Sequence, residues 1–536
     1  MQSQAWEKGT SVNFIRLFAS IALIMGAVGI AAPARADWYE ASSDHFVIYA
    51  DDSERDLRRY AENLERYHSA MEFVTRRQLD KPSPSNRVVI FVVGSGRDIR
   101  RLSGSGNRNI AGFYVPRAGA SRAFVQDIRN KNGYPDFSTI ILLHEYAHHF
   151  LISSQRFAMP RWVSEGAAEF FSAARFDSDG TVLLGRPAIH RSAELAYADD
   201  VSIEELLDYD LYLENRSSRG DAYYGRSWLL YHYLTFNTER RGQLSQYLQE
   251  IIRGTPSIEA GQRVFGDLRD LERELRGYQR SRRMLTFSLS PDRLDAGQVT
   301  LRRLPEGEAE MMDVRIRSQR GVNEEQAAEL VIEARAIAAE FPNDPGVLTA
   351  LAETEYDAGN DDAAIAAADA AIAIDPSRAN AYVQKGYALF RKARDSAVPD
   401  QAYDAAMTPF SQLNARENDH PLPLIYYYRS YVQRGMEPPE NAKAALERAA
   451  ELAPFDRQLW LTAAMMQARE GKIAIAQQSL RPLAANPHGG RSSELAQRLI
   501  NLLDNAPEGQ AFSPSALALE TVPSIDIDQG SGGSED

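Results

Sequence analysis

One short stretch, from Asp136 to Phe171, constrains this chain more than any other. It contains a His-Glu-x-x-His motif inside an apolar run. On an α-helix, residues four apart lie on one face, so His144 and His148 can hold one metal ion together. The motif places Glu145 beside the metal-bound water and not among the ligands. Two imidazoles suit zinc, and a catalytic zinc site takes a third protein ligand and leaves one position open. The sequence therefore predicts a zinc site whose third ligand comes from another segment.

A second motif follows closely, at Trp162 to Phe171, and reads WVSEGAAEFF. His-Glu-x-x-His followed by Trp-x-x-Glu-Gly-x-Ala-Glu-Phe resembles the gluzincin metallopeptidases, the superfamily that includes thermolysin and aminopeptidase N. The resemblance implies that Glu145 is the general base, and that Glu169, one turn beyond the third ligand, orients a ligand histidine. His149 points about 100° away from its neighbour on a helix, which favours a structural role or a place behind the ligands. The resemblance also implies the ligands of one Zn²⁺ per chain: His144, His148 and Glu165.

Aromatic residues are dense in the helical segment that follows, which opens with a capping-box pattern of Ser202 with Glu205. Several gluzincins place a tyrosine or histidine there to donate a hydrogen bond to the oxyanion of the reaction. A phenol suits that role, because it can donate to a developing negative charge. Aromatic side chains at this density also pack in protein cores, so both interpretations stay open for each candidate. The candidates are Tyr223, Tyr224 and His232.

The segment before the zinc motif has an α+β pattern. It predicts strands at 45–50, 88–93, 111–115 and 122–125, and a helix over 53–78 with Ser53 as N-cap. In gluzincins the edge strand of such a sheet binds extended peptide by strand addition. Gly112, Phe113 and Tyr114 are therefore candidates to line the cleft, while packing of the two aromatic rings within the sheet is equally consistent. Aminopeptidases of the superfamily carry a Gly-x-Met-Glu-Asn stretch that is absent between Val88 and Thr139, which favours an endopeptidase.

The first 36 residues have the pattern of a signal peptide. Positive residues precede an apolar run from Leu17 to Ala32, and Ala34-Arg35-Ala36 fits a cleavage site. The run is short for a membrane span, although an uncleaved anchor is the alternative. We therefore expect a periplasmic or secreted protein with cleavage near Ala36 and no stable membrane span afterwards. The chain has no cysteine, which excludes thiolate catalysis, and its net charge of −14 argues against nucleic acid as a general partner.

The second half of the chain has a different periodicity. Pro345 to Pro376 carries small and apolar residues where a tetratricopeptide repeat (TPR) needs them, and Pro454 and Pro487 lie 33 residues apart, near the repeat length of about 34. Such arrays present a concave surface to a protein partner; a passive spacer or a dimerisation surface is the alternative. We expect a signal peptide at 1–36, a peptidase domain at 37–285, a connector with short strands at 299–301 and 314–316 within 286–322, repeats at 323–500, and a disordered acidic tail at 501–536.

Together these patterns predict an α+β zincin-like catalytic domain followed by an all-α TPR solenoid. The expected function is that of an exported zinc metallopeptidase, an endopeptidase acting on peptide or protein substrates, with a possible protein partner on the repeats. One alternative is a catalytically silent gluzincin-fold scaffold that works through its repeats. Another is a zinc hydrolase of non-peptide amides. The intact Glu145 argues against the scaffold, because a pure binding protein has no use for a base at that position.

Overall fold

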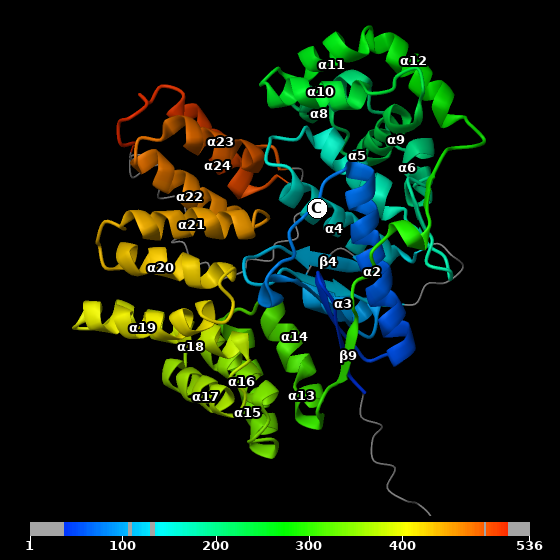
Figure 1. Ribbon diagram of the computed structural model, residues 1–536. Coiled ribbons are helices and arrows are strands. Elements are labelled where there is room, and N and C mark those ends of the chain that lie inside the picture. The colour runs from blue at the N-terminus through cyan, green and yellow to red at the C-terminus, as the bar shows by residue number, and fades with distance from the viewer. Residues whose placement is uncertain (1–36, 105–109, 129–134, 487–488, 513–536) are drawn as a thin grey trace, which may run out of the picture. The chain divides into compact units, whose positions relative to one another are not determined.

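A six-stranded sheet forms the centre of the first half of the chain, and Figure 1 labels two of its strands, β4 and β9. The computed structural model describes residues 37–104, 110–128, 135–486 and 489–512. The predicted signal peptide lies outside this range. The three central strands pair in parallel, and the outer ones are antiparallel to their neighbours. The four strands predicted from the sequence are confirmed within one residue at each end. The strand order is β4 (Gly112–Val115), β5 (Arg122–Val125), β3 (Val88–Val92), β2 (Phe46–Ala50), β1 (Tyr39–Ser42) and β9 (Thr300–Arg303).

Helices cover both faces of this sheet. On one face lie α2 (Glu54–Thr75) and α4 (Phe137–Ser154), which share a core with the inward side chains Ile48 and Ile90. On the other face lie α3 (Gly96–Ser103) and α14 (Met312–Arg320), packed against Tyr49 and Phe91. The predicted N-cap Ser53 accepts a hydrogen bond from the Asp56 amide at 3.2 Å. The sheet is thus buried on both faces, as expected for parallel central strands.

The predicted connector is part of the fold and not a linker. β8 (Phe287–Leu289) joins β7 (Val182–Leu184) and β6 (Arg175–Phe176) in a second sheet, while β9 completes the first. The strand predicted at 299–301 is confirmed as the start of β9. The strand predicted at 314–316 is wrong, because these residues lie in α14.

The error at 314–316 has a physical cause. Alternating apolar residues are typical of a strand, but on a helix residues two apart point in nearly opposite directions. Helix α14 lies between two partners: Met312 and Ile316 contact the sheet core, while Met311 and Val314 contact repeat helices. An apolar residue at every second position therefore serves two interfaces.

Short helices complete the first half of the chain. The predicted capping box of Ser202 with Glu205 is present at the start of α7. One-turn 3-10 helices lie at Pro84–Asn86, Ile189–Arg191 and Pro291–Arg293. The α-helices are α5 (Arg161–Ser172), α6 (Ser192–Tyr197), α7 (Ile203–Leu207), α8 (Tyr209–Asn215), α9 (Tyr223–Phe236), α10 (Gln243–Ile252), α11 (Ser257–Phe265) and α12 (Leu268–Gln279).

The second half is a stack of helical hairpins, which confirms a TPR-like helical region (Figure 1). Small residues let paired helices approach closely: a Cβ on Gly386 would lie 2.4 Å from the ring of Phe410 on the next helix. After α13 (Glu306–Glu310) and α14, the helices are α15 (Glu324–Glu340), α16 (Pro345–Asp357), α17 (Asp361–Ile374), α18 (Ala379–Arg394), α19 (Pro399–Asn414), α20 (Pro421–Gln433), α21 (Glu440–Leu452), α22 (Arg457–Arg469), α23 (Ile473–Ala484) and α24 (Arg491–Leu503).

The start of the predicted disordered tail is ordered. Helix α24 continues to Leu503, and the segment after it packs back on the last repeat. The Gly509 amide donates to the Gly471 carbonyl and the Phe512 amide to the Ala468 carbonyl, both at 2.9 Å. The partly buried Phe512 ring anchors this return, so the prediction is wrong for 501–512, and the rest of the tail lies outside the described residues. Within the described part of the chain, no helix has the length and apolar character of a membrane span.

Gly166 in α5 allows close contact with α9, and this contact is testable. A Cβ at this position would lie 2.4 Å from the backbone oxygen of Ser227. We therefore expect Gly166→Ala to lower the free energy of unfolding by about 1–3 kcal/mol, measured by urea denaturation. The matched control is Gly277→Ala in α12, where a Cβ meets no atom within 4 Å; this variant should be neutral or more stable by up to about 1 kcal/mol. Equal effects at the two sites would contradict the packing argument.

Glu308 on α13 ties the sheet to the repeats. Its carboxylate accepts from Arg302 on β9 at 2.6 Å and from Arg378, before α18, at 3.1 Å. Burial alone would raise the pKa of Glu308, but the Arg302 hydrogen bond and the charge of Arg378 lower it to about 2. Because the folded-state pKa lies below the unfolded value, this stabilisation is present above pH 4.5 and is lost as pH falls towards 2.

We expect Glu308→Gln to lower the free energy of unfolding at pH 7 by on the order of 3 kcal/mol. The difference in free energy of unfolding between the variant and the unsubstituted protein should shrink as the pH falls from about 5 to about 2.5. Thermal unfolding measured at each pH tests this. Glu329→Gln, at an exposed position of α15, is the control and should have little effect. A difference that does not change with pH would contradict this account.

Candidate metal centre

Helix α4 is fixed on the sheet in one rotational position. Asp136 caps it by accepting from the Thr139 amide at 2.9 Å. Leu143 and Phe150 are fully buried against the sheet, and the Tyr67 hydroxyl donates to the Leu143 carbonyl at 3.0 Å. With this side of the helix packed on the sheet, His144 and His148 are directed towards α5.

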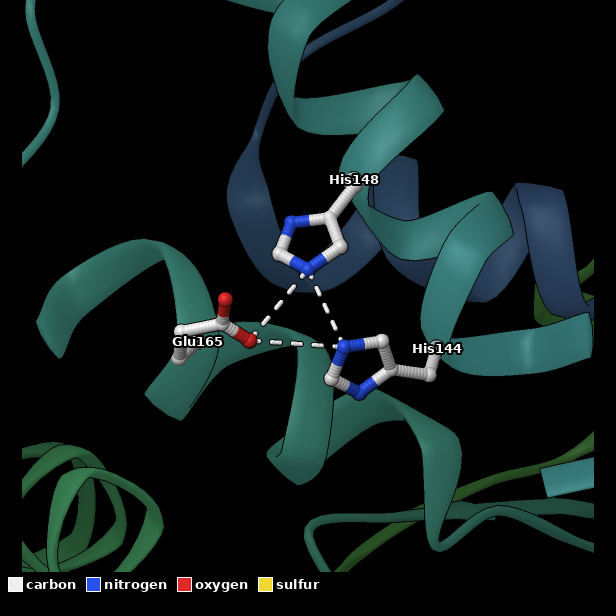
Figure 2. Close-up of side chains that lie close together, drawn as sticks. All are labelled: His144, His148 and Glu165. Atoms are coloured by element: carbon white, nitrogen blue, oxygen red, sulfur yellow. Dashed lines mark hydrogen bonds and ion pairs between the residues drawn. The ribbon is translucent and has the colours of Figure 1, made fainter. Parts of the chain in front are cut away.

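The three predicted ligands meet at one point. Figure 2 shows Nε2 of both histidines and a carboxylate oxygen of Glu165 converging from α4 and α5. The two Nε2 atoms lie 3.1 Å apart, and each lies 3.4 Å from Glu165 Oε2. Ligands about 2.0–2.1 Å from a tetrahedral zinc ion are separated by about 3.3 Å. The side chain of Glu165 is fully buried, so its charge acts at close range on both rings. The donor set and its spacing therefore fit zinc.

Glu169, one turn further along α5, lies behind His144. Its carboxylate is 3.3 Å from His144 Nδ1, 2.6 Å from His190 Nε2 and 2.5 Å from Arg191 Nη2. Burial would raise the pKa of Glu169, but the Arg191 charge and the histidine hydrogen bonds hold it well below its usual range. A charged carboxylate on Nδ1 leaves Nε2 of His144 directed at the point where it meets Nε2 of His148 and the carboxylate of Glu165.

Further residues at this site carry no motif and were missed by sequence reasoning. His190 and Arg191 belong to a 3-10 helix that follows β7 of the second sheet. The sequence signals these two residues only indirectly. If Glu169 is buried, its charge requires cationic partners. Ser164 is also new: its hydroxyl lies 3.2 Å from Nδ1 of His148, where it can orient that ring as Glu169 orients the other.

The negative charge of Glu165 raises the pKa of both candidate tyrosines. The charge of Glu165 is the largest cause of a raised pKa at Tyr224, followed by burial. At Tyr223 burial is the largest cause of a raised pKa, and the ring lies 4.4 Å from that of Tyr212. The guanidinium of Arg191 lies 4.8 Å over the Tyr224 ring. The charge of Glu165 raises the pKa of both phenols, and it is the largest cause only at Tyr224.

His232 does not share this position. Its Nε2 lies 2.9 Å from the Gly185 carbonyl oxygen, and its Nδ1 lies 2.8 Å from the Tyr278 hydroxyl. The ring is fully buried, and burial lowers its pKa to about 4. Both nitrogens are used within the core, so the structure places His232 in packing and leaves the tyrosines as candidate donors.

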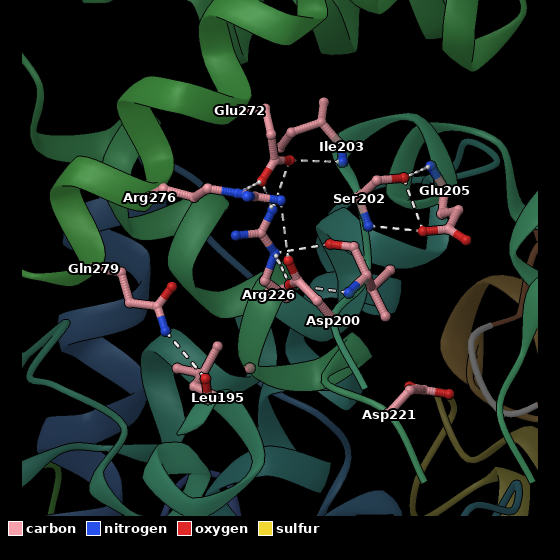
Figure 3. Close-up of polar contacts among 12 residues, drawn as sticks. Leu195, Asp200, Ser202, Ile203, Glu205, Asp221, Arg226, Glu272, Arg276 and Gln279 are labelled. Atoms are coloured by element: carbon pink, nitrogen blue, oxygen red, sulfur yellow. Dashed lines mark hydrogen bonds and ion pairs between the residues drawn. The ribbon is translucent and has the colours of Figure 1, made fainter. Parts of the chain in front are cut away.

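A buried arginine anchors the helix that carries these tyrosines. Figure 3 shows Arg226 of α9 directed at Glu272 of α12, with distances of 2.8 and 2.7 Å to its two carboxylate oxygens. Arg226 also donates to the Val201 carbonyl at 2.8 Å. Arg226 is 1% exposed, and its Nη2 contacts both oxygens of Glu272, so this charged pair holds the first turn of α9 against α12.

The edge strand presents different side chains to its two faces. Phe113 stacks on Phe124, with ring centroids 4.6 Å apart, in the core away from α4. Tyr114 points to α4, where its hydroxyl lies 2.6 Å from Nδ1 of His149. Phe113 therefore packs within the sheet, which is one of the two roles that the sequence allowed for it. His149 is directed away from the candidate ligands, in agreement with its predicted structural role.

Comparison with known proteins shows one family match. The family model described as a protein of unknown function (DUF1570) matches residues 136–257, which include the candidate ligands, Glu145 and both tyrosines. A search of curated proteins gave no match.

Similar solved structures include TTC0263, a thermophilic TPR protein in Thermus thermophilus. It is 17% identical over 33% of this chain and 91% of that chain, with a TM-score of 0.28. A MamA RS-1 ArsTM double mutant is 16% identical over 37% of this chain and 98% of that one, with a TM-score of 0.27. A crystal structure of MamA is 16% identical over 38% of this chain and 98% of that chain, with a TM-score of 0.25.

The position of Glu169 makes a testable prediction about metal affinity. We expect Glu169→Gln to weaken zinc binding by about 10- to 100-fold, since His144 loses the carboxylate that orients it. Competition with a chromophoric chelator measures the affinity, and circular dichroism checks folding. Glu214→Gln, on the exposed surface of α8, should bind zinc as the unsubstituted protein does. Unchanged affinity in a folded Glu169→Gln variant would contradict the role given to this residue.

Proposed function

We propose that this protein is an exported zinc-dependent metallopeptidase, and that it acts as an endopeptidase. One observation carries the proposal: two histidines of one helix converge with a buried carboxylate of the next, at the separations that a tetrahedral zinc ion requires. The motif that supplies the histidines also supplies Glu145, which is partly exposed on the same helix. A purely structural zinc site would use four protein ligands and would not need this base.

The chemistry assigns a task to each side chain. Zinc held by His144, His148 and Glu165 would supply a Lewis acid that activates water and polarises a carbonyl oxygen. Glu145 accepts the proton of the attacking water and later donates a proton to the leaving amine. Tyr224, and Tyr223 as the alternative, donates a hydrogen bond to the carbonyl oxygen as negative charge develops on it.

The sheet supports a peptide as the substrate. β4 is the terminal strand of the six-stranded sheet and packs beside the helix with the metal site. An extended peptide can add to such a strand through main-chain hydrogen bonds, which suits internal segments of any sequence. The missing Gly-x-Met-Glu-Asn stretch removes the usual recognition of a free amino terminus, which favours endopeptidase action. We propose that the repeats bind a protein partner or substrate, and that residues 1–36 direct export to the periplasm or the medium.

The decisive test combines metal analysis with one variant. We expect about one zinc per chain in protein purified from Asp37 onward without added metal. We also expect this protein to cleave an unstructured peptide library, and mass spectrometry detects the products. Glu145→Gln should keep its zinc and lose activity by at least about 100-fold, while Glu214→Gln keeps both.

Each other outcome has a distinct meaning. Full activity in Glu145→Gln would rule out the proposed base. Bound zinc with no cleavage of peptides, but with cleavage of other amides, would indicate a different substrate class. Bound zinc with no hydrolysis at all would indicate a scaffold protein. Protein that takes up no zinc, even after reconstitution, would overturn the metal site.

A further inference from the structure

Two arginines at the ends of the turn between β4 and β5 bring positive charge into the protein. Val115 lies opposite Arg122 in the register of the two strands, and Arg117 follows Val115 by two residues, which puts both arginines on one face of the hairpin. Helix α14 covers this face, and Nε of Arg122 donates to the side-chain oxygen of Gln319 at 3.1 Å. Ala118, in the turn itself, is buried in the core of the repeats. Arg122 is 8% exposed, so its charge lies in the interior.

Both guanidinium groups have donors that the rest of the protein does not use. Nη2 of Arg117 and Nη1 of Arg122 are buried and have no hydrogen-bond partner among the described residues. Within the same part of the chain, no carboxylate forms an ion pair with either side chain. A buried donor without a partner is costly, and a buried charge without a counterion is more so. Water can accept a hydrogen bond but does not compensate a charge, so the two arginines indicate an anion.

Two carboxyl groups of α16 act on Arg122 without contacting it. Glu353 accepts from the Gln319 side chain at 3.0 Å and from Asn380 of α18 at 3.1 Å, so amide groups hold it. Asp357 accepts from a serine of α14 at 2.6 Å. Burial, and next the charge of Glu353, raise the pKa of Asp357 to about 7, so this group carries only part of a negative charge at neutral pH. Neither group supplies a direct counterion to the arginines.

Positive charges repel one another at this position. Burial, and next the charge of Arg117, lower the pKa of Arg122 to about 9, and Arg315 of α14 lowers it further. Arg315 has a partner of its own, because its guanidinium lies 4.3 Å over the Tyr49 ring and donates to the Tyr49 hydroxyl at 3.2 Å. An anion bound by Arg117 and Arg122 would offset this repulsion and accept from both unused donors.

We propose that Arg117 and Arg122 bind a small oxyanion on the face of the β4–β5 hairpin that α14 covers. The fork of a guanidinium group matches the paired oxygen atoms of a phosphate, a sulfate or a carboxylate. The ligand is a small ion and not a macromolecule, since Arg122 is enclosed by the fold. Such an ion would strengthen the contact between the first half of the chain and the repeats, and this role is independent of the proposed peptidase activity.

The test measures urea denaturation of the full chain at increasing phosphate, sulfate or acetate, with chloride keeping the ionic strength constant. We expect at least one of these oxyanions to lower the unfolding equilibrium constant in a saturable way, by about 100-fold at 100 times its Kd. Phosphate and sulfate also stabilise proteins by exclusion from their surface, but that effect does not saturate. Isothermal titration calorimetry should give the same Kd. Tighter binding of acetate would assign a carboxylate ligand, and tighter binding of phosphate or sulfate a tetrahedral oxyanion.

Variants locate the binding site. Arg122→Gln and Arg117→Gln should each weaken binding by about 10- to 100-fold. Arg117 is the less buried of the two, so Arg117→Gln serves as the test if Arg122→Gln does not fold. The matched control is Arg55→Gln, at a side chain that is 87% exposed, which should bind as the unsubstituted protein does.

The titrations are repeated after zinc has been removed with a chelator, because phosphate and carboxylates also bind zinc. Binding by Arg117 and Arg122 should not depend on zinc. Saturable binding that disappears with the zinc would place the anion at the metal centre and overturn the inference. Binding that persists unchanged in Arg117→Gln and in a folded Arg122→Gln would also overturn it, as would the absence of a saturable effect with all three oxyanions.

Discussion

The buried carboxylate of Glu165 is the interaction on which the rest of the site depends. A charge with no exposed surface is costly unless cations or polar groups surround it, and here two imidazoles lie 3.4 Å away. To bring these groups together, α4 and α5 must be held at one distance and rotation. The sheet fixes α4 through its apolar face, and α9 fixes α5 through the close contact at Gly166. The packing of α4 and α5 therefore positions the three side chains that converge at Glu165.

Buried ion pairs lie around the candidate metal position. Glu169 balances Arg191 and orients His144, while Arg226 and Glu272 hold the neighbouring helix. The carboxylate of Glu169 also contacts His190, and Arg226 also donates to the Val201 carbonyl, so each pair is held by further hydrogen bonds. Such pairs are poor contributors to net stability but good determinants of orientation, and orientation is what a site with three converging ligands needs.

The sequence was informative wherever a local rule applied. Helical spacing placed His144 and His148 on one face, and strand patterns located the sheet. Rules of this kind fail where a residue has two partners or a distant one. Val314 and Ile316 alternate like a strand because α14 lies between the sheet and the repeats. His190 and Arg191 have no motif, and only the fold brings them to Glu169. The order of residues 504–512 follows from a return contact on the last repeat, which composition does not report.

The pairing of β1 with β9 has a consequence for how the chain reaches this fold. Tyr39 lies opposite Arg303, so the first strand finds its outer neighbour only after more than half of the chain has been synthesised. Contacts between such distant segments are slow to form, and until then β1 presents an unpaired edge to other chains. The chain therefore passes through an interval in which its sheet is open on the side opposite to the metal site, and a factor that shields exposed strand edges would act during that interval.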